Sequence, residues 1–271
     1  MIPRDYITEW RRQAPWIQDF QVEQDLVISR ALAEMFSHPL LRSSLAFRGG
    51  TALYKLYITP PARYSEDIDL VQVSAEPIGP VMDALRAILD PWLGKPQWKQ
   101  TEGRVTLNYR FGSEDTPPLR LRLKIEINSR EHFALFERAS IPFAVSSRWF
   151  TGSAEISTYH LDELLGTKLR ALYQRRKGRD LFDLAIALKN PGVDPARVVK
   201  AFLGYVEKEE GRITRALFER NLAAKVGMPQ FAADIGPMLA PGYEWDMVSA
   251  MDEVSSRLIA LLPGEPWKRD Q

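Results

Sequence analysis

Residues 47–73 read FRGGTALYKLYITPPARYSEDIDLVQV, and this stretch decides the fold that we expect. A Gly-Gly-Thr turn at residues 49–51 opens a helical pattern, and glycines there let backbone N–H groups approach an anion at the helix N-terminus. Asp67 and Asp69 follow in a strand pattern, so both carboxylates point to the same face. Two such carboxylates repel each other unless a cation lies between them, and Mg²⁺ or Mn²⁺ is the usual cation. The stretch therefore predicts metal-assisted phosphoryl transfer.

The alternative for Asp67 and Asp69 is that they are ordinary solvent-facing acids on an antiparallel strand. Two observations favour the metal. Aspartate is depleted in strands, and the flanking Ile68 and Leu70 face a core while the two acids share the other side. We therefore predict that Asp67 and Asp69 are catalytic and hold the metal.

A third acid comes from residues 119–128, where apolar and polar residues alternate strictly. The leucines and isoleucines face one way, and the other face carries Arg120, Arg122, Lys124, Glu126 and Asn128. A site with two metal ions needs at least three acidic ligands, so we predict that Glu126 is the third. The alternative is that Glu126 only forms an ion pair with Lys124 or Arg122.

Nucleotide-binding candidates surround the glycine turn. They are Arg48, Gly49, Gly50, Thr51, Lys55 and Ser65. Ser65 precedes Asp67 by two positions and shares its face, where it would contact a phosphate or the water shell of the metal, or only form a hydrogen bond at the start of the strand. Arg48 and Lys55 flank the turn, where each would either touch a phosphate or lie on the surface.

A second cluster lies on helical patterns further along the chain. If residues 179–184 are helical, Asp180 and Asp183 share a face, and Lys168 on the preceding helix points toward the same side. In that case Lys168 would neutralise a triphosphate, and an aspartate would orient it or act as a base. The alternative, equally supported by the pattern, is a surface helix joined by Arg–Asp ion pairs.

Composition sets the class of protein. The chain has 271 residues, no cysteine and a formal net charge of +1, so disulfides, thiolate metal sites and cysteine nucleophiles are excluded. No apolar run approaches the ~18 residues that span a bilayer, and the polar N-terminus is unlike a signal peptide, so we expect a cytoplasmic protein with no membrane partner. Strand patterns give way to helical ones, which predicts an α/β domain over residues 1–150 and a helical domain over residues 151–271 that completes the active-site cleft.

These motifs resemble the AbiEii/AbiGii family of nucleotidyltransferase toxins, relatives of the MenT toxins. The resemblance spans roughly residues 20–190 and rests on four segments, with Glu23-Gln-Asp25 matching a Glu-Lys-Asp in the family's first helix less closely. The segments are Phe47–Lys55 with Ser65–Leu70, Lys124–Glu126, Leu164–Leu172 and Arg179–Leu184.

The resemblance implies an α+β fold, in which a nucleotidyltransferase (polymerase β-like) core with a mixed sheet precedes an all-helical C-terminal domain. It also implies transfer of a nucleoside monophosphate from an NTP to an acceptor, with the tRNA 3′ end expected, Mg²⁺ or Mn²⁺ as cofactor, and a cognate antitoxin as partner. In that reading Lys168, Asp180 and Asp183 are catalytic. Two alternatives remain: the same chemistry on a protein or small molecule, and a non-catalytic RNA-binding module.

Overall fold

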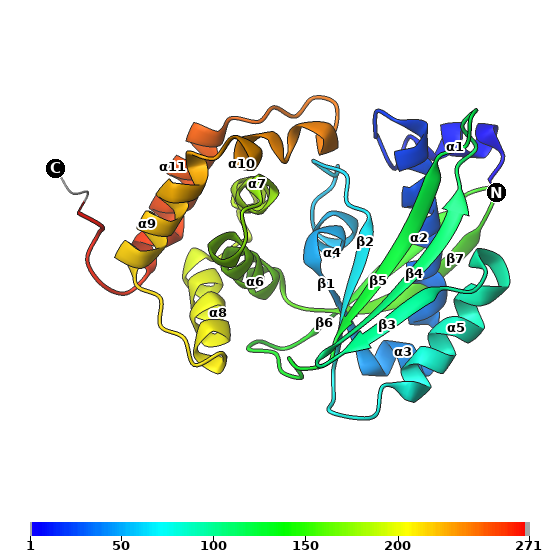
Figure 1. The fold of residues 1–271 in the computed structure, drawn as a ribbon, viewed down its shortest axis with the longest axis horizontal. Helices are drawn as coiled ribbons and strands as arrows, with labels where there is room; N and C mark the ends of the chain where they lie inside the picture. The colour runs from blue at the N-terminus through cyan, green and yellow to red at the C-terminus, as the bar shows by residue number, and fades with distance from the viewer. Residues whose placement is uncertain (1, 269–271) are drawn as a thin grey trace. The chain divides into compact units, whose positions relative to one another are not determined.

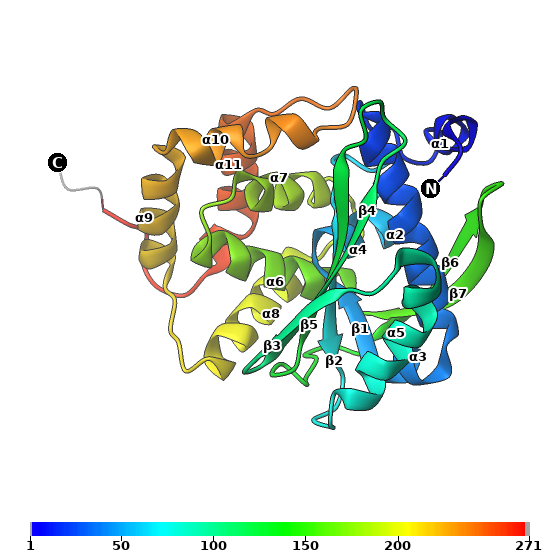
Figure 2. The same cartoon turned by 45° about the vertical axis from the view of Figure 1, so that its right-hand side comes forward.

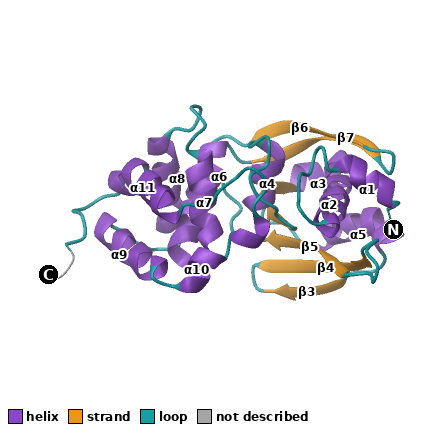
Figure 3. Cartoon of the chain, turned by 90° about the horizontal axis from the view of Figure 1, so that it is seen from above, coloured by secondary structure: helices purple, strands orange, loops and turns teal. Residues whose placement is uncertain are grey.

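The computed structural model describes residues 2–268, and the chain divides into two compact units, Met1–Tyr159 and His160–Gln271. Helices and a seven-stranded sheet make up the described part of the first unit, and the described part of the second is built from helices (Figure 3). A membrane-crossing helix is not found in residues 2–268, where no helix is sufficiently long and apolar.

The sheet of the first unit is mixed and has the strand order β3-β4-β5-β2-β1-β7-β6. Strand β2 lies near its middle, antiparallel to β1 and parallel to β5. The strands are β1 (Leu45–Arg48), β2 (Asp67–Gln72), β3 (Gln97–Thr101), β4 (Arg104–Gly112), β5 (Arg120–Asn128), β6 (Ala139–Ser146) and β7 (Thr151–Thr158).

Helices pack around this sheet in the first unit. They are α1 (Arg4–Trp10), α2 (Asp19–Ser37), α3 (Pro39–Ser44), α4 (Gly49–Leu56) and α5 (Gly79–Leu93). Helices α2, α3 and α5 pack against its strands, and the hydroxyl of Tyr109 on β4 lies 2.9 Å from Asp90 on α5 (Figure 1). Because strand side chains alternate, the buried Ile68 and Ile125 face these helices while the acids between them face the opposite side.

The second unit is a helical assembly in which α6 packs against both α7 and α8 (Figure 2). Its helices are α6 (Leu161–Gln174), α7 (Gly178–Ala187), α8 (Pro195–Lys208), α9 (Arg215–Val226), α10 (Pro229–Ala233) and α11 (Met247–Arg257), with 3₁₀ turns at Gly236–Met238 and Ile259–Leu261. Gly166 permits the close contact of α6 with α8, because a Cβ there would lie 2.5 Å from the Cβ of Ala201.

The strongly periodic segments form the elements that the sequence predicted. The helical pattern over residues 161–188 forms two helices, α6 and α7, and α7 begins at Gly178. Five of the described helices and strands were not predicted: α1, α3, β3, β6 and β7. Strand β3 is exposed along its whole length and β7 buries few residues, so neither carries the alternation that reveals a strand. Strand β1, which leads into the glycine turn, lies inside the sheet between β2 and β7.

Candidate active site

The three predicted acidic ligands lie on adjacent strands of the first unit. In the parallel pairing of β2 with β5, Asp69 is directly beside Glu126 and Asp67 is beside Lys124. Residues two apart on a strand share a face, so Asp67, Asp69 and Glu126 all project from the polar side of the sheet. The structure therefore brings these three carboxylates to one region of one face.

Lys124 neutralises part of this negative charge. Its ammonium lies 3.1 Å from Oε2 of Glu126 and 3.4 Å from Oδ2 of Asp67. The guanidinium of Arg104 on β4 adds a contact of 3.3 Å to Oε1 of Glu126. Glu126 thus forms the ion pair with Lys124 that the sequence offered as an alternative, and its second cation is Arg104 and not Arg122.

Burial and neighbouring charges together shift the pKa values of Asp69 and Lys124. Burial raises the pKa of the Asp69 carboxyl above its ordinary value, and the neighbouring Asp67 raises it further. Burial alone would lower the pKa of Lys124, but the carboxylates of Asp67 and Glu126 outweigh that effect and raise it. A cation is therefore favoured beside these acids.

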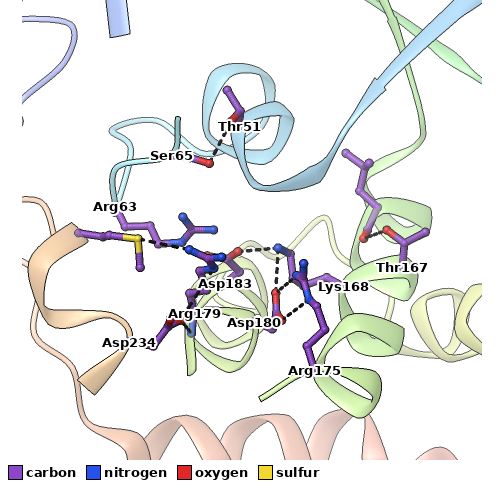
Figure 4. A network of polar contacts seen from close by, with 12 residues as sticks. Thr51, Arg63, Ser65, Thr167, Lys168, Arg175, Arg179, Asp180, Asp183 and Asp234 are labelled. Carbon is purple, nitrogen blue, oxygen red and sulfur yellow. Dashed lines mark hydrogen bonds and ion pairs between the residues drawn. The ribbon is translucent and has the colours of Figure 1, made fainter. Parts of the chain in front are cut away.

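The glycine turn is fitted to the acidic strand. Gly49 has a φ of +84°, a backbone conformation that side-chain-bearing residues rarely adopt, and a Cβ there would lie 2.3 Å from Oδ2 of Asp69. Thr51, in the first turn of α4, donates a hydrogen bond of 2.5 Å to the carbonyl of Asp67, and its hydroxyl lies 2.9 Å from that of Ser65 (Figure 4). The N-terminus of α4 is thereby tied to the acidic strand β2.

Arg63 is a buried cation at the same turn that the sequence analysis did not select. A Cβ on Gly50 would lie 2.6 Å from Nη2 of Arg63 and 3.2 Å from Oγ of Ser65, so the guanidinium packs beside the start of α4 (Figure 4). Its Nη1 donates to the carbonyl of Tyr64 at 2.9 Å, and its guanidinium carbon lies 5.1 Å from the ring centroid of Tyr54. The sequence carried one signal for Arg63. It precedes Ser65 by two residues, the same spacing that separates Ser65 from Asp67 and Asp67 from Asp69.

Arg48 and Lys55, the other predicted nucleotide contacts, each have an acidic partner. The guanidinium of Arg48 is bonded to Glu131; burial would lower its pKa, but this carboxylate more than compensates and raises it. The ammonium of Lys55 lies 2.6 Å from Asp25 and 2.9 Å from the hydroxyl of Ser29, both on α2. The structure therefore assigns both cations an ion pair within the first unit.

Lys168, Asp180 and Asp183 meet inside the second unit. Nζ of Lys168 on α6 lies 2.9 Å from Oδ2 of Asp183 and 3.3 Å from Oδ1 of Asp180, both on α7 (Figure 4). Arg175 contacts both oxygens of Asp180, at 2.7 and 3.1 Å. Both aspartates are fully buried, which differs from the surface helix offered as the alternative, and they orient the lysine.

The donor set of the first unit suits a hard divalent cation, because it consists of carboxylate oxygens. Within residues 2–268, however, no three acidic or histidine side chains already form a group that could hold a metal ion. On the acidic strands, the ammonium of Lys124 lies within ion-pair distance of both Asp67 and Glu126. The carboxylates of Asp67, Asp69 and Glu126 are suitable ligands for a metal ion and lie on the same face of the sheet. Binding a metal ion there would require the ammonium of Lys124 to move.

Comparison with known proteins identifies the family of this chain. The sequence matches the family described as Nucleotidyl transferase AbiEii toxin, Type IV TA system, over residues 30–252. No curated protein matches it significantly.

Two solved structures are similar in fold. MenT4, a nucleotidyltransferase toxin from Mycobacterium tuberculosis H37Rv, has a TM-score of 0.69 at 18% identity, with 97% of this chain and 91% of that chain covered. JHP933 from Helicobacter pylori has a TM-score of 0.55 at 18% identity, with 89% and 90% covered. These likenesses confirm the predicted α+β nucleotidyltransferase fold. Because the family match covers most of its length, this chain belongs to the AbiEii family of nucleotidyltransferase toxins of type IV toxin–antitoxin systems.

Proposed function

We propose that this nucleotidyltransferase is metal-dependent and transfers a nucleoside monophosphate from an NTP to the 3′ end of tRNA. Asp67, Asp69 and Glu126 would hold Mg²⁺ or Mn²⁺, and the start of α4 would bind the phosphates. The observation that carries the proposal is the register of β2 with β5, which sets Asp69 directly beside Glu126 next to a glycine turn. Bound there, a divalent cation would stabilise negative charge on the transferred phosphoryl group.

The residues around the turn would position the nucleotide. Gly49 and Gly50 carry no side chain of their own at the start of α4, so its backbone N–H groups would be available to phosphate oxygens. The hydroxyl of Ser65 lies beside that of Thr51 and would contact a phosphate, and Arg63 adds a positive charge beside Gly50. These contacts would hold the α-phosphorus in line with an attacking acceptor hydroxyl.

Support for a nucleic-acid acceptor comes from a basic row on the polar side of the sheet. Arg120 and Arg122 are exposed on β5 and share the face of Lys124 and Glu126, while Arg110 on β4 pairs directly with Arg122. At about 3.3 Å per residue, this row extends roughly 20 Å from Glu126. A strip of that length suits the phosphates of an RNA end, which proteins bind through backbone and 2′-OH contacts.

Lys168, in the second unit, is the remaining catalytic candidate of this proposal. Two buried aspartates fix its ammonium, so its positive charge is pre-oriented, and Asp180 and Asp183 would act as its positioning residues. The family further implies a cognate antitoxin, which would restrain the activity.

The test is transfer of label from each α-labelled NTP to total tRNA, with and without Mg²⁺. We expect label in the tRNA band only when Mg²⁺ is present. Asp67→Asn and Asp69→Asn should each lower the rate by roughly 100-fold or more, since a metal ligand is lost. Asp83→Asn, at an exposed position on α5, is the matched control and should retain the wild-type rate.

Three outcomes would contradict the proposal. Label on protein or on a small molecule would identify another acceptor. A thermal shift with NTP but no transfer to any acceptor would indicate a binding module. Full activity in EDTA, or in Asp67→Asn, would remove the metal site.

A further inference from the structure

The ammonium of Lys124 lies at the position where a metal ion would bind the carboxylates of both strands. The register of β2 with β5 places Lys124 beside Asp67 and Glu126 beside Asp69, so the ammonium reaches a carboxylate on each strand. It lies 3.4 Å from Oδ2 of Asp67 and 3.1 Å from Oε2 of Glu126, with the side chain 24% exposed. An ammonium and a divalent cation would therefore compete for the same oxygens.

Few other cations balance these acids within the first unit. Asp67, Asp69 and Glu126 carry three negative charges when ionised, and Arg48, the nearest arginine on β1, is bonded to Glu131. Arg104 forms an ion pair with Glu126, but its side chain is 61% exposed, so solvent screens its charge well. Without a metal, Lys124 is the cation that bridges the two strands.

We propose that Lys124 is an internal counter-cation, which holds the acidic strands together in the metal-free protein and is displaced when a divalent cation binds. This inference rests on the metal site of the proposed function. Mg²⁺ and Mn²⁺ bind oxygens at about 2.0–2.2 Å, which leaves no room for an ammonium between the same carboxylates. The flexible four-carbon stem of lysine lets the ammonium leave without moving β5.

The displaced ammonium would stay on the polar face of the sheet, on the same side as the glycine turn. A nucleotide that arrives with its metal would offer the phosphate oxygens that replace the lost carboxylate contacts. Metal binding would then free the positive charge of Lys124 to contact the polyphosphate. The metal alone should therefore bind weakly, and nucleotide should increase the affinity for the metal.

The test measures binding of Mn²⁺ alone, by the electron paramagnetic resonance signal of the free ion at one fixed pH. Lys124→Met removes the competitor and should lower the Kd for Mn²⁺ about tenfold, since two partly exposed ion pairs no longer have to be broken. Lys124→Arg keeps a cation and should stay within about threefold of wild type. Arg122→Met, two residues away on the same face, is the matched control for charge and should also stay within about threefold.

A second readout does not depend on affinity. In EDTA the thermal midpoint of Lys124→Met should lie below that of wild type, because the carboxylates lose their counter-cation, and Mn²⁺ should raise it more than it raises the wild-type midpoint. This readout also shows that the variant folds.

The failure of this inference differs from the failure of the proposed function. If Asp67→Asn weakens Mn²⁺ binding but Lys124→Met leaves the Kd unchanged or raises it, the metal site stands and the counter-cation role is overturned. If wild type binds no Mn²⁺ that depends on Asp67, both are overturned.

Discussion

Replacement of Gly49 by alanine should displace the carboxylate of Asp69. Two costs can be worked from the structure. The φ of +84° at Gly49 costs a residue with a Cβ about 1–2 kcal/mol. The new Cβ would lie 2.3 Å from Oδ2 and 3.0 Å from Cβ and Cγ of Asp69, whereas non-bonded heavy atoms prefer about 3.5 Å, so the carboxylate has to move by roughly 1 Å.

Overpacking of this size costs about 1–3 kcal/mol, so Gly49→Ala should lower the free energy of unfolding by about 3 kcal/mol in total. A domain of ordinary stability survives that loss, and the variant should still fold. Its activity should suffer more than its stability, because a displacement of about 1 Å at a reacting centre can cost on the order of 100-fold in rate.

Urea unfolding followed by tryptophan fluorescence measures the first effect, and NMP transfer from a labelled NTP measures the second. Gly79→Ala is the matched control, since its added Cβ at the start of α5 would meet no heavy atom within 4 Å apart from its chain neighbours and its own helix backbone. The control should stay active and change stability by less than about 1 kcal/mol. The argument that Asp69 requires a glycine here is refuted if the free energy of unfolding of Gly49→Ala lies within about 0.5 kcal/mol of the wild-type value and the variant keeps full activity. A difference of 0.5 kcal/mol is roughly the scatter for a neutral surface change.

Three further predictions concern the second unit, each measured by urea unfolding. Gly166→Ala should destabilise by about 1–2 kcal/mol, because its Cβ would lie 2.5 Å from that of Ala201 and the clash outweighs the gain in helix propensity. Lys168→Met should destabilise by about 3 kcal/mol, because it removes the ammonium 2.9 Å from the fully buried Asp183. Burial lowers the pKa of Lys225 to about 8 from an ordinary 10.5, so the unfolded chain binds more protons above pH 8. The free energy of unfolding of wild type, relative to Lys225→Met, should therefore rise by about 2 kcal/mol between about pH 8 and pH 10.

These predictions have distinct contrary outcomes. A Gly166→Ala protein as stable as wild type would mean that α6 and α8 can separate without cost. Lys189→Met, at an exposed position, is the control for Lys168→Met. If the two variants lose the same free energy of unfolding, the buried ion pair does not explain the loss. A pH profile that is parallel in wild type and Lys225→Met would show that Lys225 titrates near its ordinary value.

Sequence periodicity was sufficient for most of the regular elements. Alternation over residues 119–128 determined which side chains of β5 are buried, since neighbouring strand residues point to opposite faces, and the buried Leu123, Ile125 and Ile127 agree. The same reasoning brought Asp67 and Asp69 to one face. It failed for β3, which is exposed along its whole length, and for β7, which buries only Ile156 and Thr158.

Local pattern could not reveal partners that are distant in the chain. That Asp69 lies beside Glu126, 57 residues later, follows from the parallel pairing of β2 with β5, which only the folded sheet specifies. The ion pairs of Lys55 with Asp25 and of Arg48 with Glu131 depend in the same way on tertiary contacts, as does the placement of Arg63 against Gly50.

The amino-acid sequence by itself determined the residue types, the two-residue spacing of the acids and the glycines that a close backbone approach requires. Tertiary structure alone decided which cation lies among the acids and how near it is. The physical reason is that backbone periodicity fixes only the face to which a side chain points, while charge balance depends on strand register and burial, which arise from the packing of segments far apart in the chain.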